Sequence, residues 1–98
     1  MSDSAFIIVI DRATDDELNT AHEAIKSKAD GWWHRYTNTW IVGGLTASEW
    51  RDLVKRVLIS DSASVLVLKL PEAEDRRWAY YGPRAEERMG WLHRNYTN

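Results

Sequence analysis

The fold is decided by an aromatic stretch with the sequence Gly31-Trp32-Trp33-His34-Arg35-Tyr36-Thr37-Asn38-Thr39-Trp40-Ile41-Val42. Large aromatic and β-branched residues flank a Thr-Asn-Thr break, which is typical of two adjacent strands joined by a tight turn. The stretch holds three of the six tryptophans of the chain. We therefore expect a β-hairpin around which the remaining elements are organised.

The two faces of this hairpin can be predicted from period-2 alternation, if the turn is the two-residue loop 37–38. One face then carries Trp33, Arg35, Trp40 and Val42, and the other carries Trp32, His34, Tyr36 and Ile41. Aromatic residues fall on both faces, so both faces are expected to be covered.

A strand and a helix are predicted before the hairpin. Residues 5–10 form a continuous apolar run that is typical of a buried strand. The sequence from Thr14 to Glu17 has the form of a capping box, and Leu18, Ala21 and Ile25 follow at helical spacing. These signals predict a helix over residues 14–29.

A second helix and a last strand are predicted after the hairpin. Thr46 to Glu49 repeats the capping-box pattern, and the apolar positions Trp50, Leu53, Val54, Val57 and Leu58 form one helical stripe. Residues 63–70 then alternate, with Val65 and Val67 on one face and three leucines, 66, 68 and 70, on the other.

The order strand, helix, strand, strand, helix, strand predicts an α+β protein with a ferredoxin-like βαββαβ fold, an antiparallel sheet with two helices on one face. We expect one domain over residues 1–98, with a core at 5–70 and a C-terminal arm and short third helix at 71–98. The sheet face opposite the helices is expected to be apolar, so a partner sheet or the arm must cover it.

Composition narrows the function classes. The formal net charge is −2, with 13 basic and 15 acidic residues, which does not favour nucleic-acid binding by bulk electrostatics. There are no cysteines, so disulfides and thiolate zinc sites are excluded, and no apolar run reaches the ~20 residues of a membrane span. His22 and His93 show no metal-ligand spacing, and we expect no histidine-based zinc site. We expect a cytoplasmic protein without a membrane partner.

Three stretches resemble the SinR-like group of small proteins, relatives of CRISPR-associated protein 2. They are residues 7–11 at the first strand, 32–36 with 39–42 at the hairpin, and the segment from Trp78 through Gly82-Pro83 into the last helix. The resemblance implies a ferredoxin-like homodimer whose open sheet faces meet, with the segment after the fourth strand reaching the neighbour. It also implies a setting in prokaryotic or phage defence or counter-defence.

The resemblance implies that Asp11, which closes the first strand, is the candidate catalytic and metal-binding residue. Two such carboxylates, one from each subunit, suit Mg²⁺ or Mn²⁺ and phosphodiester cleavage. The alternative is that Asp11 caps the connection into the first helix, a common role for acids at strand ends.

A second set of candidates combines basic and aromatic side chains. His34 and Arg35 can contact phosphate or a partner, or His34 can be a half-buried interface residue. Four residues of the arm are candidate contacts with either nucleic acid or a protein partner: Arg76, Arg77, Trp78 and Tyr80. For the dimer interface we expect Trp32, Tyr36 and Trp78.

Two functions of different class follow. The first is a dimeric, non-catalytic protein-interaction module without a cofactor. The second is a metal-dependent endonuclease, acting on RNA or DNA, with Asp11 from each protomer at its centre.

Overall fold

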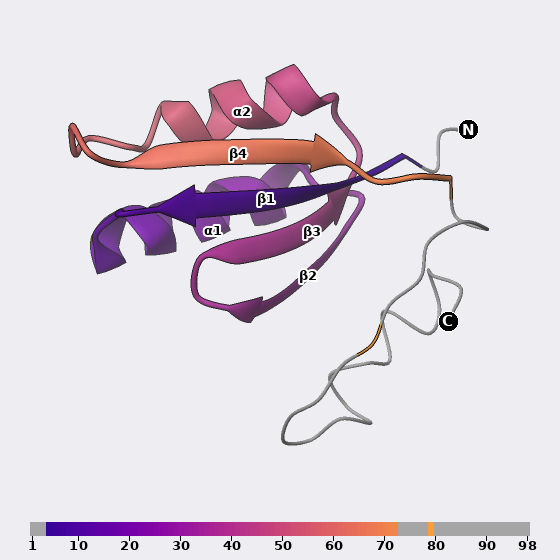
Figure 1. The fold of residues 1–98 in the computed structure, drawn as a ribbon, viewed down its shortest axis with the longest axis horizontal. Coiled ribbons are helices and arrows are strands. Elements are labelled where there is room, and N and C mark those ends of the chain that lie inside the picture. The colour runs from indigo at the N-terminus through magenta and orange to yellow at the C-terminus, as the bar shows by residue number, and fades with distance from the viewer. Residues whose placement is uncertain (1–3, 73–78, 80–98) are drawn as a thin grey trace.

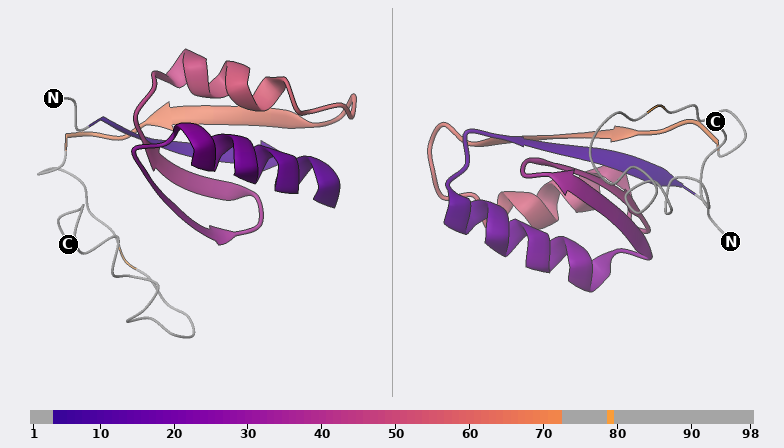
Figure 2. Two further views of the ribbon diagram at one scale, coloured as in Figure 1. Left: turned by 180° about the vertical axis from the view of Figure 1, so that it is seen from behind. Right: turned by 90° about the horizontal axis from the view of Figure 1, so that it is seen from below.

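The structure is a computed structural model that describes residues 4–72 and residue 79. Its elements are β1 (Ala5–Asp11), α1 (Asp15–Lys28), β2 (Gly31–Tyr36), β3 (Thr39–Gly43), α2 (Ala47–Lys55) and β4 (Ser64–Lys69). The strands form one sheet in the order β2-β3-β1-β4, with every neighbouring pair antiparallel (Figure 1). Both helices lie on one side of the sheet, as the right-hand view of Figure 2 shows. The predicted α+β fold is confirmed, and the strand order is compatible with a ferredoxin-like arrangement.

Both predicted capping boxes are present and set where the helices begin. The Thr14 hydroxyl accepts from the Glu17 backbone N–H at 3.1 Å, and the Glu17 carboxylate accepts from the Thr14 N–H at 2.8 Å. Thr46 and Glu49 repeat the exchange before α2, at 3.2 and 2.8 Å. Each box satisfies two backbone N–H groups that a helix start leaves unpaired.

The second helix is shorter than its apolar stripe predicted. It ends at Lys55, so Val57 and Leu58 lie beyond it, although both still pack against the core. An apolar stripe measures burial, and residues outside a helix can be buried as well. The predicted extension of the helix to Leu58 was therefore wrong, although the predicted burial of Val57 and Leu58 against the core was right.

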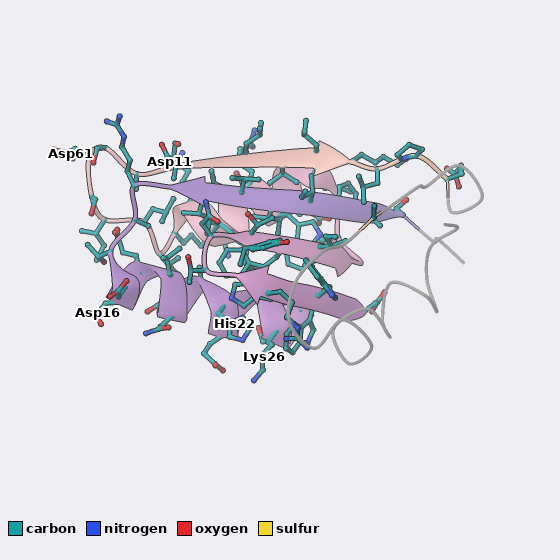
Figure 3. The ribbon with its side chains drawn as sticks, turned by 60° about the horizontal axis from the view of Figure 1, so that its bottom comes forward. Asp11, Asp16, His22, Lys26 and Asp61 are labelled. Carbon is teal, nitrogen blue, oxygen red and sulfur yellow. The ribbon has the colours of Figure 1, made fainter. Side chains whose placement is uncertain are left out.

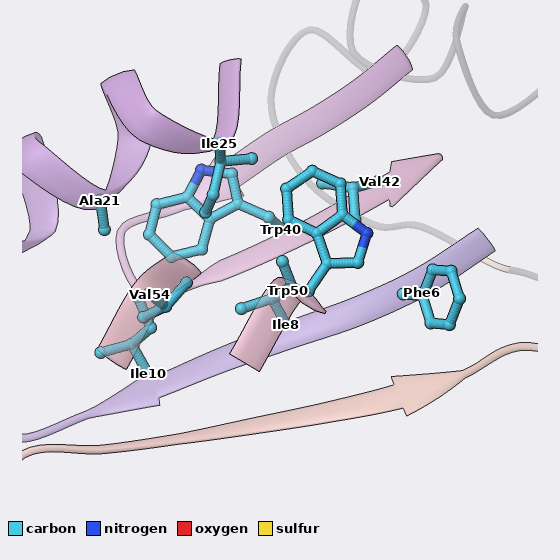
Figure 4. Close-up of a cluster of buried hydrophobic side chains, with 9 residues drawn as sticks. All are labelled: Phe6, Ile8, Ile10, Ala21, Ile25, Trp40, Val42, Trp50 and Val54. Carbon is cyan, nitrogen blue, oxygen red and sulfur yellow. The ribbon is translucent and has the colours of Figure 1, made fainter. Parts of the chain in front are cut away.

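The core fills the space between the sheet and the two helices (Figure 4). It is a cluster of nine buried side chains: Phe6, Ile8, Ile10, Ala21, Ile25, Trp40, Val42, Trp50 and Val54. Alternate residues of β1 and β3 point into it, which follows from the period-2 geometry of a strand. We call this helix-covered side of the sheet the covered face and the opposite side the open face.

The predicted faces of the hairpin were wrong in β2. Tyr36 pairs with Thr39, so the turn is the predicted two-residue loop, but the register shifts between Trp33 and Tyr36. Beyond this irregularity Trp32 pairs with Val42, and Trp33 pairs with Ile41. Directly paired residues share a face, and a bulge inserts one residue and reverses the alternation. Trp32 therefore lies on the covered side and Trp33 on the open side.

Several predictions concern residues that the structure does not describe. The contacts assigned to Arg76, Arg77, Trp78 and Tyr80, and the third helix, fall outside residues 4–72 and 79. Within those described residues, no helix has the length and apolarity needed to cross a membrane.

Candidate functional site

Asp11 lies at the end of β1, where it pairs with Ser64 of β4. Its side chain is 69% exposed, and its Oδ2 lies 3.7 Å from the Nε of Arg12. Arg12 adopts a left-handed backbone conformation with φ of 61°, an uncommon state for a residue other than glycine. Alternation along β1 places Asp11 on the open face with Ile7 and Val9. Asp11 is therefore an exposed carboxylate that forms an ion pair with the neighbouring Arg12.

The open face carries an apolar surface formed by alternate residues of four strands. It comprises Ile7, Val9, Trp33, Tyr36, Ile41, Leu66 and Leu68, and we call this set the open-face patch. Leu66 and Leu68 are 55% and 53% exposed, and Tyr36 is 51% exposed. Tyr36 also meets Trp33 edge-on at 5.9 Å between ring centroids. The exposed part of the patch is therefore Leu66, Leu68 and Tyr36, whereas Trp33 is buried, at 7% exposure, and the other members are partly buried. The leucines of β4 share this face, as predicted.

His34 lies on the other side of the sheet, in a cluster that sequence spacing did not reveal. Its ring stacks on Trp40 with centroids 4.3 Å apart and planes within 3°. His22 from α1 approaches the His34 ring to 4.8 Å and meets Trp32 edge-on at 5.2 Å. We call these four residues the aromatic cluster. Helix and strand periodicity place them only within their own elements, and packing of α1 on the hairpin brings them together.

Arg35 takes no part in this cluster, and Trp32 lies at its exposed edge. Arg35 is exposed, and its guanidinium donates to the His34 carbonyl at 3.2 Å. Trp32 is 36% exposed, and its pairing with Val42 places it on the covered side, away from the open-face patch. Trp32 was expected on the same face as Tyr36, but the register shift places the two on opposite faces, and Trp33 lies on the face of Tyr36 instead.

A small pocket of about 260 Å³ adjoins the cluster between α1 and the hairpin turn. It is lined by Asp15, Leu18, Asn19, His22, His34 and Thr37. Among the described residues, no three His, Cys, Asp or Glu side chains gather closely enough to hold a metal ion. The labelled side chains of Figure 3 place His22 and Lys26 on α1 and Asp11 at the end of β1. The two histidines and the candidate acid thus belong to separate sites.

Glu17 is the one charged residue that the described chain buries, at 5% exposure. Besides the Thr14 N–H, its carboxylate accepts from the backbone N–H groups of Ile59 and Ser60 and from the Ser60 hydroxyl. The bonds from the backbone N–H groups of Thr14, Ser60 and Ile59 lower the pKa of Glu17 from 4.5 to about 2. Buried acids with shifted pKa values are candidate catalytic groups. Here four donors occupy the carboxylate, which ties α1 to the loop before β4.

Comparison of the chain with protein-family models, with curated proteins and with solved structures found no match.

Proposed function

We propose that this protein is a small dimeric scaffold that works as a non-catalytic protein-interaction module. The observation that supports this proposal best is the open-face patch, where Leu66 and Leu68 are each more than half exposed. Contiguous exposed apolar surface is uncommon on monomeric soluble proteins and marks interaction sites. The resemblance to relatives of CRISPR-associated protein 2 suggests a role in defence or counter-defence.

The occupant that we propose for the patch is a second copy of this chain. A two-fold dimer presents the same surface from both subunits, so the surface must be complementary to itself. The patch consists of aliphatic and aromatic residues, and Asp11 lies at the strand end beside it. Two such patches can meet without opposing like charges at their centres. A ferredoxin-like sheet buried on both sides would result.

Sedimentation velocity at micromolar concentration tests the dimer. We expect the wild type to sediment as a dimer and Leu68→Glu to sediment as a monomer, because the new carboxylate would be buried against apolar side chains. Ile59→Glu is the matched control, since Ile59 is 84% exposed in the loop before β4 and lies outside the sheet. A monomeric wild type would contradict the proposal, and so would equal dissociation of both variants.

A metal-dependent endonuclease remains the second candidate because Asp11 is exposed at the end of the same open face. A dimer through that face offers one Asp11 from each subunit, and carboxylate oxygens suit Mg²⁺ or Mn²⁺. The test incubates labelled RNA and DNA with either metal and compares the wild type with Asp11→Asn. Cleavage that disappears in the variant would support the enzyme, and absence of cleavage by the wild type would support the module.

A further inference from the structure

The indole N–H of Trp40 makes a hydrogen bond that depends on the charge of His22. Trp40 is fully buried in β3, and its Nε1 lies 3.0 Å from Nδ1 of His22 on α1. An indole N–H only donates, so His22 Nδ1 must accept and carries no proton. The neutral ring therefore has its proton on Nε2. In the imidazolium form both nitrogens donate, and two N–H groups would face each other.

The hydrogen bond of His34, unlike that of His22, does not require an unprotonated Nδ1. Its Nδ1 lies 2.9 Å from the carbonyl oxygen of Thr39, which only accepts, so this nitrogen already carries a proton. A second proton would go to Nε2 and would leave that bond intact. Of the two neighbouring histidines, His22 loses its hydrogen bond on protonation and His34 keeps it.

The charged and titratable groups around His22 come from the elements packed against it. His34 faces it from β2, and Glu23 and Lys26 flank it on α1. Asp15 lines the adjoining pocket, and Arg35 is bonded to the His34 carbonyl. Burial lowers the pKa of His22 below its ordinary value of 6.5, and the neighbouring His34 lowers it further, with Glu23 opposing.

We propose that His22 is a proton-sensitive latch that holds α1 to the β2–β3 hairpin while it is neutral and releases the hairpin when it is protonated. The latch is the bond between Trp40 Nε1 and His22 Nδ1 together with the ring contacts of His22 with Trp32 and His34. Protonation breaks the bond and leaves the buried indole N–H of Trp40 facing a donor. It also places a positive charge beside the ring of His34. Mildly acidic conditions therefore loosen this edge of the domain.

The direction of the effect follows from linkage. A histidine whose pKa is lower in the folded state than in the unfolded state binds its proton more readily after unfolding. The stability that it contributes is fully present above pH 6.5, the ordinary value, and is lost as the pH falls through the lower folded pKa. The latch is closed at neutral pH.

A titration by ¹H–¹⁵N NMR, from neutral pH to pH values below 6.5, tests the latch in the whole chain. We expect His22 to titrate below 6.5 and the Trp40 indole N–H signal to shift, with faster hydrogen exchange, at the same midpoint. Trp50 is an internal control, because its buried indole N–H bonds no described residue. A Trp40 signal that stays constant while His22 titrates would overturn the proposal.

Two variants separate the latch from general acid sensitivity. His22→Gln keeps an oxygen that can accept from Trp40 and cannot titrate, so the shift of the Trp40 signal in this pH range should disappear. His34→Gln keeps the bond between Trp40 and His22, so the shift should persist. Retention of the shift in His22→Gln would also overturn the proposal, because another group would then be its cause.

Discussion

The two faces of the sheet are formed by the same strands but differ in how deeply their apolar side chains are buried. On the covered face Ile8, Trp40 and Val42 are completely buried, whereas on the open face Leu66 and Leu68 are more than half exposed. Both sets are apolar, so composition alone does not distinguish them. The helices cover one face and remove its side chains from water within the single chain, whereas the leucines of β4 on the other face stay half in water.

Substitution in the covered face should have the largest effect on folding. Ile8→Ala removes a fully buried side chain and leaves a cavity that neighbouring residues fill only partly, so we expect a loss of about 2–5 kcal/mol in the free energy of unfolding. Chemical denaturation monitored by tryptophan fluorescence would measure it. A loss within the range of surface substitutions would contradict the role of this face as the core.

The second effect concerns the carboxylate that ties α1 to the loop before β4. Glu17→Gln should lower stability at neutral pH, because the amide nitrogen presents a donor to backbone N–H groups. Since the pKa of Glu17 is lowered from 4.5 to about 2, its contribution is fully present above pH 4.5 and is lost as the pH falls toward 2.

Thermal unfolding at a series of pH values would measure this contribution. The wild type should lose stability over that window more steeply than Glu17→Gln. Glu49→Gln is the matched control, because Glu49 serves the capping box of α2 and is exposed. Equal losses in the two variants would show that the bonds to Ile59 and Ser60 add nothing beyond a helix cap.

A smaller effect is expected where the chain turns from β3 toward α2 on the covered face. Gly44 has a φ of 102°, and a Cβ there would lie 3.5 Å from the Asp30 nitrogen, an ordinary contact. Gly44→Ala should therefore cost about 1–2 kcal/mol, from backbone conformation and not from a clash. Gly43→Ala is the control, since its Cβ would meet Ser4 O at 3.7 Å without a positive φ. Similar denaturation midpoints for the two variants would refute this explanation.

The smallest effect on the single chain is expected on the open face. Leu68→Ala should change the free energy of unfolding by no more than about 0.5 kcal/mol when measured at concentrations where the protein is monomeric. At higher concentrations the wild type should gain stability relative to the variant, because association stabilises the folded state. Denaturation at two concentrations measures both values. A large loss in the free energy of unfolding of the monomeric variant would contradict the proposed difference between the two faces.

Much of the fold could be predicted from local patterns, and the reasons differ between elements. Both capping boxes were correct because they join residues three apart, and the faces of β4 were correct because the strand alternates regularly. The faces of β2 were wrong because its irregularity between Trp33 and Tyr36 depends on pairing with β3. For the candidate site, Asp11 could be placed at the end of β1, but no spacing pointed to the contact between His22 and His34.

The sequence by itself determined the order of elements, the starts of the helices and the apolar character of the strands, since these depend on interactions between near neighbours in the chain. Only the tertiary structure decided which apolar face the helices cover and which tryptophan of β2 lies on each side. It also brought Glu17 to Ser60 and Trp40 to His22. Those contacts join residues far apart in sequence, and their hydrogen bonds form only when packing brings donor and acceptor together.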